Sequence, residues 1–228
     1  MKSVFLLLTI LSCATSSVSQ SLNSTSSNYV STKSFVSQQR DSLLNQNPSL
    51  EELSVVFEYC LMEKIIPCWY GTKWSFEGHT NNPKEGEIAC GYFVSTTLKH
   101  IGVPLNRYRL AQQNPLNEAK TLAMGTEVLT IEYEDLSQLK VRLNKAVEEG
   151  VYFIGFDEFH VGFAHVKGDR IFLIHSNFIG SKGVVNEDFF ESEVVGMCNR
   201  IHLVNLHQNE MLLKAWMNGE EIPIVRGK

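Results

Sequence analysis

The hydrophobic period changes from helical to strand-like about two thirds of the way along the chain. Before this point apolar residues recur every three or four positions, as at Leu53 and Phe57, which is the spacing of one helix face. From Val151 onward the segments are short and alternate with period two, and Gly168-Asp169 is a two-residue hairpin signal between two of them. Helices followed by an antiparallel sheet predict an α+β fold.

The composition fits one globular domain with an N-terminal extension. The chain has 228 residues, of which 43% are hydrophobic, so it can bury a substantial core. Its formal net charge of −5 argues against a nucleic-acid-binding surface. Residues 12–33 are rich in Ser, Thr and Asn, a composition typical of a mobile tether. We therefore expect a tether with a short helix over residues 20–48 and a single domain over residues 49–228.

The N-terminus has the features of a secretory signal. Lys2 precedes an apolar run, residues 4–11, that is too short to span a bilayer, and no later stretch is long and apolar enough to do so. Small residues at Ser17-Val18-Ser19 predict a signal peptide over residues 1–19. Alternatively, residues 10–13 resemble a bacterial lipoprotein box that ends at Cys13. We expect an exported protein, periplasmic, extracellular or held at the bacterial envelope by a lipid on Cys13.

The cysteines do not form a metal-binding pattern. The chain contains Cys13, Cys60, Cys68, Cys90 and Cys198. In an exported protein Cys60 can pair with Cys68, and the sequence leaves this pairing open. No C-x-x-C spacing indicates a zinc site or a thioredoxin-like pair. The sequence therefore gives no sign of a metal or an organic cofactor.

Cys90 begins a predicted helix. Phe93, Leu98 and Ile101 recur at helical spacing after it, and Gly102 follows as a C-terminal stop. A thiol in the first turn of a helix faces unpaired N–H groups and the positive end of the macrodipole. Both lower the thiol pKa, and the thiolate is the nucleophilic form. The alternative is an inert core cysteine, which is a common role for this residue.

Three histidines lie on the predicted hairpin. His160 and His165 point to opposite faces because side chains alternate along a strand, which argues against a shared metal site. The two-residue turn pairs Gly162 with His175 and His160 with Asn177, so His175 becomes a diagonal neighbour of His160 on the same face. Gly162 leaves room between them. One imidazole can then accept a thiol proton while a second group orients it, as Cys–His catalysis requires. His175 is the better orienting residue, with Asn177 in reserve.

At this point the chain resembles the NlpC-type cell-wall cysteine peptidases, which have a papain-like core. Four segments match motifs of that family in order and cover roughly residues 66–186. The segments are Gly71-Thr72-Lys73-Trp74-Ser75-Phe76-Glu77-Gly78 (G-x-P-Y-x-W-G-G), Cys90-Gly91-Tyr92-Phe93-Val94 (C-S-G-L-V), Gly102-Val103-Pro104-Leu105-Asn106-Arg107 with Gln112 (G-x-x-L-P-R-x-S-x-x-Q), and His160-Val161-Gly162-Phe163 with Ile174-His175-Ser176 (H-V-G-I, I-H-A). The resemblance implies N-terminal helices, including the Cys-bearing helix, packed on an antiparallel sheet.

The resemblance also implies roles for individual residues. Cys90 is the nucleophile, His160 the general base and acid, and His175 the orienting third residue. Trp74 stands where the family has a Tyr suited to an oxyanion contact, and its indole N–H can donate one hydrogen bond there. We group Asn177 with Trp74 as candidate oxyanion or substrate contacts.

The expected function is hydrolysis of an amide bond, which by the resemblance lies in the peptide stems of peptidoglycan. One alternative keeps the fold and the Cys–His pair but acts as an acyltransferase, or as an amidase on a substrate outside the cell wall. The other is a non-catalytic surface binding module, favoured by Trp74 and by Ala89, which replaces the family's Asp. Arg107 and Gln112 are expected to hold the loop after the helix.

Overall fold

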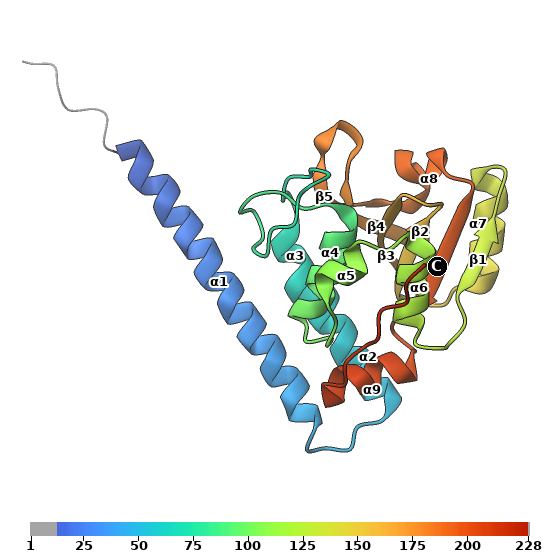
Figure 1. Cartoon of the computed structure of the whole chain (residues 1–228), viewed down its shortest axis with the longest axis horizontal. Helices are drawn as coiled ribbons and strands as arrows, with labels where there is room; N and C mark the ends of the chain where they lie inside the picture. Colours follow the sequence, from blue (N-terminus) through green and yellow to red (C-terminus); the bar gives the residue numbers. More distant parts are fainter. Residues whose placement is uncertain (1–12, 228) are drawn as a thin grey trace, which may run out of the picture.

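The structure is a computed structural model that describes the backbone of residues 13–227 and the side chains from Asn28 onward. Within this part of the chain, six antiparallel strands form one sheet in the order β1-β6-β2-β3-β4-β5, with helices on both of its faces (Figure 1). The strands are β1 (Leu129–Glu132), β2 (Gly150–Phe156), β3 (His160–Lys167), β4 (Arg170–Asn177), β5 (Gly183–Asp188) and β6 (Arg200–Asn205). The fold is therefore α+β, as the change in hydrophobic period predicts.

The helices precede the sheet, connect its strands or, in the case of α9, follow the last strand. They are α1 (Cys13–Leu43), α2 (Leu50–Glu58), the π-helix η1 (Tyr59–Ile65), α3 (Ile66–Trp69), α4 (Cys90–His100), α5 (Arg107–Ala111), α6 (Pro115–Ala123), α7 (Leu136–Ala146), α8 (Glu193–Met197) and α9 (Glu210–Asn218), with short 3-10 turns η2 (Ile179–Ser181) and η3 (Phe189–Glu191). Ser49 begins α2 through a capping box with Glu52. Helical structure continues past Pro67, which lies in the first turn of α3, where its missing N–H is tolerated.

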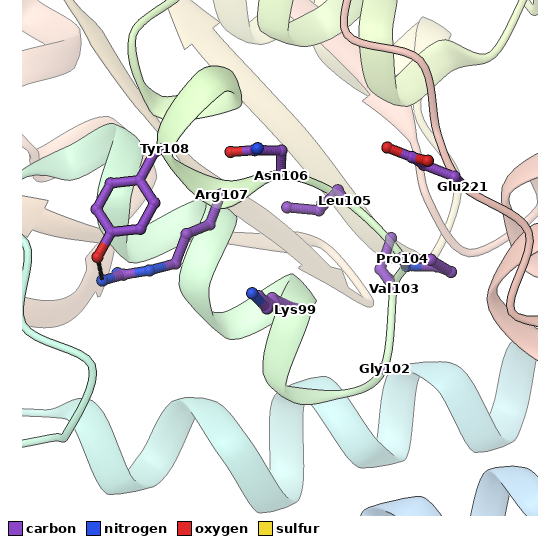
Figure 2. Close-up of a pocket in the computed structure, with 9 residues that line it drawn as sticks. All are labelled: Lys99, Gly102, Val103, Pro104, Leu105, Asn106, Arg107, Tyr108 and Glu221. Carbon is purple, nitrogen blue, oxygen red and sulfur yellow. Dashed lines mark hydrogen bonds between the residues drawn. The ribbon is translucent and has the colours of Figure 1, made fainter.

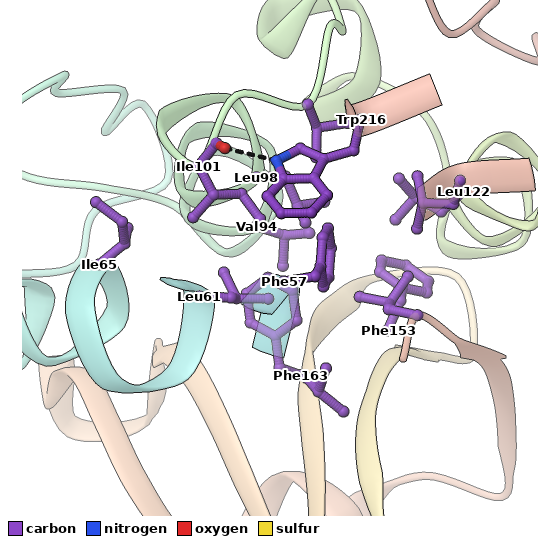
Figure 3. Close-up of a cluster of buried hydrophobic side chains, with 14 of the residues drawn as sticks. Phe57, Leu61, Ile65, Val94, Leu98, Ile101, Leu122, Phe153, Phe163 and Trp216 are labelled. Carbon is purple, nitrogen blue, oxygen red and sulfur yellow. Dashed lines mark hydrogen bonds between the residues drawn. The ribbon is translucent and has the colours of Figure 1, made fainter. Parts of the chain in front are cut away.

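Side-chain alternation along the strands builds two hydrophobic cores. Phe153 and Phe163 face the larger core, together with residues of α2, η1, α4 and α9 (Figure 3). Trp216 of α9 joins this core and donates from Nε1 to the Ile101 carbonyl at 2.7 Å. On the other face, Ile154 packs with residues of α7 and α8. Because both faces are covered, β2 is buried along its whole length.

The N-terminus of α4 lies where β3 begins. The rings of Phe93 on α4 and Phe163 on β3 meet edge to face with centroids 5.9 Å apart. Just before α4, the Ile88 carbonyl accepts a hydrogen bond from the buried Ser176 hydroxyl of β4 at 2.6 Å. These two contacts hold the first turn of α4, which carries Cys90, against the strands that carry the two histidines.

The N-terminal segment differs from the expected tether and short helix over residues 20–48, because Cys13–Leu43 is one continuous helix. Tyr29, Val36 and Leu43 are buried at seven-residue intervals and form a stripe that packs against the core. This spacing anchors a helix that is otherwise rich in Ser, Thr and Asn. Most of the predicted signal sequence, residues 1–12, lies outside the described residues. None of the helices described is long and apolar enough to cross a membrane.

Cys60 and Cys68 are free thiols in the structure rather than a disulfide. Cys60 lies in η1 and Cys68 in α3, which follow one another without a break. Eight residues of helix correspond to a rise of about 12 Å. A disulfide needs Cα atoms within about 7 Å, so the helical path keeps the two thiols apart.

Candidate active site

Cys90 and His160 line the same cavity, which has a volume of about 720 Å³. Cys90 is the first residue of α4 and His160 the first residue of β3. Aromatic side chains form much of the wall around them, among them Trp74, Phe159 and Phe178. The structure thus brings together a thiol and an imidazole that are 70 positions apart in the sequence.

The two hairpin histidines are hydrogen-bonded to each other. His160 Nε2 lies 2.7 Å from His175 Nδ1, and both side chains are buried. The strand register, with Phe163 opposite Ile174, is the one that the two-residue turn predicts. A Cβ atom on Gly162 would lie 2.9 Å from the His175 Cβ, so the glycine does provide the predicted space. The predicted diagonal pairing of the histidines is confirmed.

A third residue, Glu187, extends this pair and was not predicted from the sequence. Its Oε1 lies 3.1 Å from His175 Nε2. On β5 the residue opposite His175 is Val185, so Glu187 is again a diagonal neighbour on the next strand. The β4–β5 register identifies Glu187 in the way that the β3–β4 register identifies His175, because both residues are diagonal neighbours on the adjacent strand. However, residues 178–182 connect β4 to β5 without a two-residue turn that fixes the register.

The relay of His160, His175 and Glu187 determines which ring nitrogens carry protons. Hydrogen bonding to His175 lowers the pKa of the Glu187 carboxyl, so it is ionised and can only accept. His175 must then donate from Nε2, which leaves its Nδ1 as an acceptor. His160 in turn donates from Nε2, so His160 Nδ1 carries the free lone pair. That nitrogen is the one available to accept the thiol proton.

The predicted low pKa of Cys90 is wrong. Burial raises the pKa of the Cys90 thiol to about 11, and the carboxyl of Glu118 adds to this rise. The backbone N–H groups of Val161, Gly91 and Cys90 itself act in the opposite direction but do not overcome the loss of solvation. The N–H groups at the helix N-terminus therefore stabilise the thiolate in part, but the thiol stays protonated in the resting site.

The imidazole of His160 is also neutral at rest. Burial, with a further contribution from His175, lowers the pKa of His160 well below its ordinary range. Among the described residues, no hydrogen bond joins Cys90 to His160. A neutral thiol beside a neutral imidazole suits general-base catalysis, in which the proton moves as the sulfur attacks, and such contacts often tighten when substrate binds.

Trp74 and Asn177, grouped as oxyanion or substrate contacts, lie in different environments. Trp74 lines the cavity, packs on Phe178 with ring centroids 6.1 Å apart, and has no hydrogen-bond partner for its indole N–H in the described part of the chain. Asn177 is fully buried, and its Oδ1 accepts from the Ile179 N–H at 2.8 Å. Trp74 can thus donate to a ligand, whereas Asn177 shapes the turn after β4 and is not a wall of the cavity.

Arg107 makes structural contacts, but to the loop before Cys90 rather than to the expected loop after the helix. Its guanidinium donates to the Thr96 hydroxyl at 2.7 Å and to the His79 carbonyl at 2.9 Å, which ties the loop before Cys90 to α4. It also donates to Tyr108 at the edge of a second, open pocket of about 540 Å³ (Figure 2). That pocket contains neither Cys90 nor the histidines. Gln112, also expected to hold the loop, instead lines the cavity at Cys90.

The site has no counterpart identified by similarity. No protein-family model, curated protein or solved structure matches this chain. Among the residues that the structure describes, no group of three or more His, Cys, Asp or Glu side chains could hold a metal ion.

Proposed function

We propose that this protein is a cysteine hydrolase that cleaves an amide bond. The observation that carries the proposal is the relay Glu187–His175–His160, which leaves His160 Nδ1 unprotonated on a side chain that shares a cavity with Cys90. An imidazole whose free nitrogen is fixed by hydrogen bonds to its other nitrogen meets the requirement for a base that activates a thiol.

In the proposed mechanism His160 Nδ1 accepts the thiol proton while Cys90 Sγ attacks the carbonyl carbon. The oxygen of the tetrahedral intermediate accepts hydrogen bonds from the Trp74 indole and the Cys90 backbone N–H. The C–N bond then breaks, and His160 transfers its proton to the leaving amine. Water, deprotonated by His160, hydrolyses the remaining thioester, which releases a carboxylic acid and restores the thiol.

For the substrate we propose peptide stems of peptidoglycan, acted on by an exported enzyme with an NlpC-type papain-like core. Support comes from the four segments that resemble the family motifs, because each supplies a residue to the cavity wall: Trp74, Cys90, Gln112 and His160. These segments lie far apart in the sequence, so only the tertiary fold brings them to one cavity. The signal-like N-terminus supports export to the compartment where this substrate is found.

The experiment is to incubate the purified protein with isolated peptidoglycan and to analyse the soluble products by mass spectrometry. We expect shortened stem peptides from the wild type and none from Cys90→Ala. Cys68→Ala is the matched control, because Cys68 is a half-buried free thiol that does not line the cavity. Equal release by the Cys90→Ala variant would contradict the proposal.

A non-catalytic binding module is the second candidate, and the raised pKa of Cys90 favours it. In that case peptidoglycan co-sediments the protein, the Cys90→Ala variant co-sediments equally, and no peptide is released by either. The relay is the observation against it, since a binding surface does not need a histidine with a defined free nitrogen.

A further inference from the structure

Glu118, on α6, is a buried carboxyl for which the proposed mechanism has no use. Glu118 is only 2% exposed, yet it lines the same cavity as Cys90. Glu118 Oε2 has no hydrogen-bond partner in the described part of the chain. A Cβ atom at Gly91 would lie 3.2 Å from Glu118 Oε1, so the carboxyl is pressed against the first turn of α4.

Such a carboxyl is costly to bury without a partner. Burial raises the pKa of Glu118 well above its ordinary range, which favours the neutral, protonated form of the carboxyl. An adjacent positive charge would reverse this shift by favouring the carboxylate. The described residues do not supply that charge, because no Lys or Arg lines the cavity.

The rest of the cavity is also suited to a cation. Its other charged wall residues are Glu77 and Glu158, both acidic. Glu158 is largely exposed and lies 3.7 Å from Arg200, so it is already partnered at the rim. Aromatic side chains, including Trp74 and Phe178, also line the cavity, and aromatic rings attract ammonium groups. A protonated carboxyl can also donate to a neutral carbonyl, but the presence of Glu77 and the absence of Lys and Arg among the described wall residues favour a cation.

We propose that Glu118 forms a subsite for a protonated primary amine of the substrate, next to the bond that Cys90 attacks. This inference rests on the proposed function for the identity of the reaction, and it adds that the substrate carries a free N-terminus or a side-chain amine near that bond. The ammonium donates to Glu118, which releases its proton to solvent as the ion pair forms.

Three thiol reagents of different charge test the subsite without a guess about the substrate. They are 2-aminoethyl, methyl and 2-sulfonatoethyl methanethiosulfonate, which are cationic, neutral and anionic. Each forms a mixed disulfide with the Cys90 thiolate and releases methanesulfinate. The rate at Cys90 is followed by peptide mass spectrometry at pH 7, and each rate is divided by that of the same reagent with 2-mercaptoethanol.

For the wild type we expect the normalised rate of the cationic reagent to exceed that of the neutral reagent by about tenfold, the effect of ~1.4 kcal/mol, and the anionic reagent to be the slowest. Glu118→Gln should reduce the cation-to-neutral ratio to about twofold or less. Using the ratio cancels any change in the thiol pKa. The exposed, partnered Glu158 provides the comparison, and Glu158→Gln should lower the ratio by no more than about twofold, since exposed charges are screened.

Two outcomes overturn the subsite: no cation preference in the wild type, or a preference that Glu118→Gln leaves intact. The wild-type measurement stands even if Glu118→Gln does not fold. The result is also separable from the proposed hydrolysis. A cation preference without peptide release would refute the proposed hydrolysis but support the subsite. Peptide release without a cation preference would support the hydrolysis and refute the subsite.

Discussion

At the scale of single residues, the protonation state of the site depends on Glu187. Its ionised carboxylate lies on β5, two strands away from His160, and acts through His175. Replacing the carboxylate by an amide would allow the side chain to donate as well as accept. His175 could then carry its proton on Nδ1, which would force the proton of His160 onto its own Nδ1 and block the base.

We therefore expect Glu187→Gln to lower kcat by about tenfold to a hundredfold with little change in KM, less than the 10²–10⁴ that a lost general base costs. The measurement is steady-state kinetics of release of the stem peptides that the proposed mass-spectrometry experiment detects. Glu132→Gln, an exposed carboxylate on β1 of the same sheet, is the matched control and should behave as the wild type. An unchanged kcat in Glu187→Gln would show that the carboxylate does not orient the relay.

At the scale of elements, the β3–β4 hairpin acts as the frame of the relay. Gly162 lies opposite His175, and the absence of a side chain there allows the imidazole to reach His160. A Cβ atom at this position would also lie 2.9 Å from the Ile174 carbonyl oxygen. Neither neighbour can move freely, since both belong to the paired strands.

Gly162→Ala should therefore lower the free energy of unfolding by about 1–3 kcal/mol, the usual cost of overpacking, and displace His175 enough to reduce kcat. Chemical denaturation and kinetics measure the two effects. Gly196→Ala in α8 is the control, because a Cβ atom there meets nothing within 4 Å. If Gly162→Ala were as stable and active as Gly196→Ala, the close packing around His175 would be refuted.

At the scale of the whole molecule, Tyr29 joins the N-terminal helix to the domain. The Trp69 indole N–H donates to the Tyr29 hydroxyl at 2.8 Å, and that hydroxyl lies 2.7 Å from His100 Nδ1. Burial lowers the pKa of His100 to about 3, so the ring is neutral and its Nδ1 can accept. This buried network fixes α1 against α3 and the end of α4.

Tyr29→Phe should lower the free energy of unfolding by about 1–3 kcal/mol, because it leaves the buried Trp69 N–H without its partner. Thermal or denaturant unfolding of the full chain measures the change. Tyr59→Phe is the control: Tyr59 is partly exposed and its ring contact with Lys64 does not need the hydroxyl. Equal stability of the two variants would mean that α1 is held by its apolar stripe alone.

Features that depend on neighbouring positions were predictable from the sequence. The capping box at Ser49 and the turn at Gly168-Asp169 are local, and the turn fixes a register that makes His160 and His175 diagonal neighbours. The same locality explains the α+β class, since the hydrophobic period of a segment reflects how that segment is buried.

Features that depend on what surrounds a side chain required the tertiary structure. The dipole of α4 is a local property and would lower the Cys90 pKa, but the packing around the thiol removes water and raises it instead. Glu187 contacts His175 through the pairing of β4 with β5, which no two-residue turn specifies. Glutamate is usually exposed, and only the packing of α6 against α4 shows that Glu118 is buried. Local pattern determined which groups the chain offers for catalysis, whereas solvation and long-range pairing, set by the fold, decided their charge and their partners.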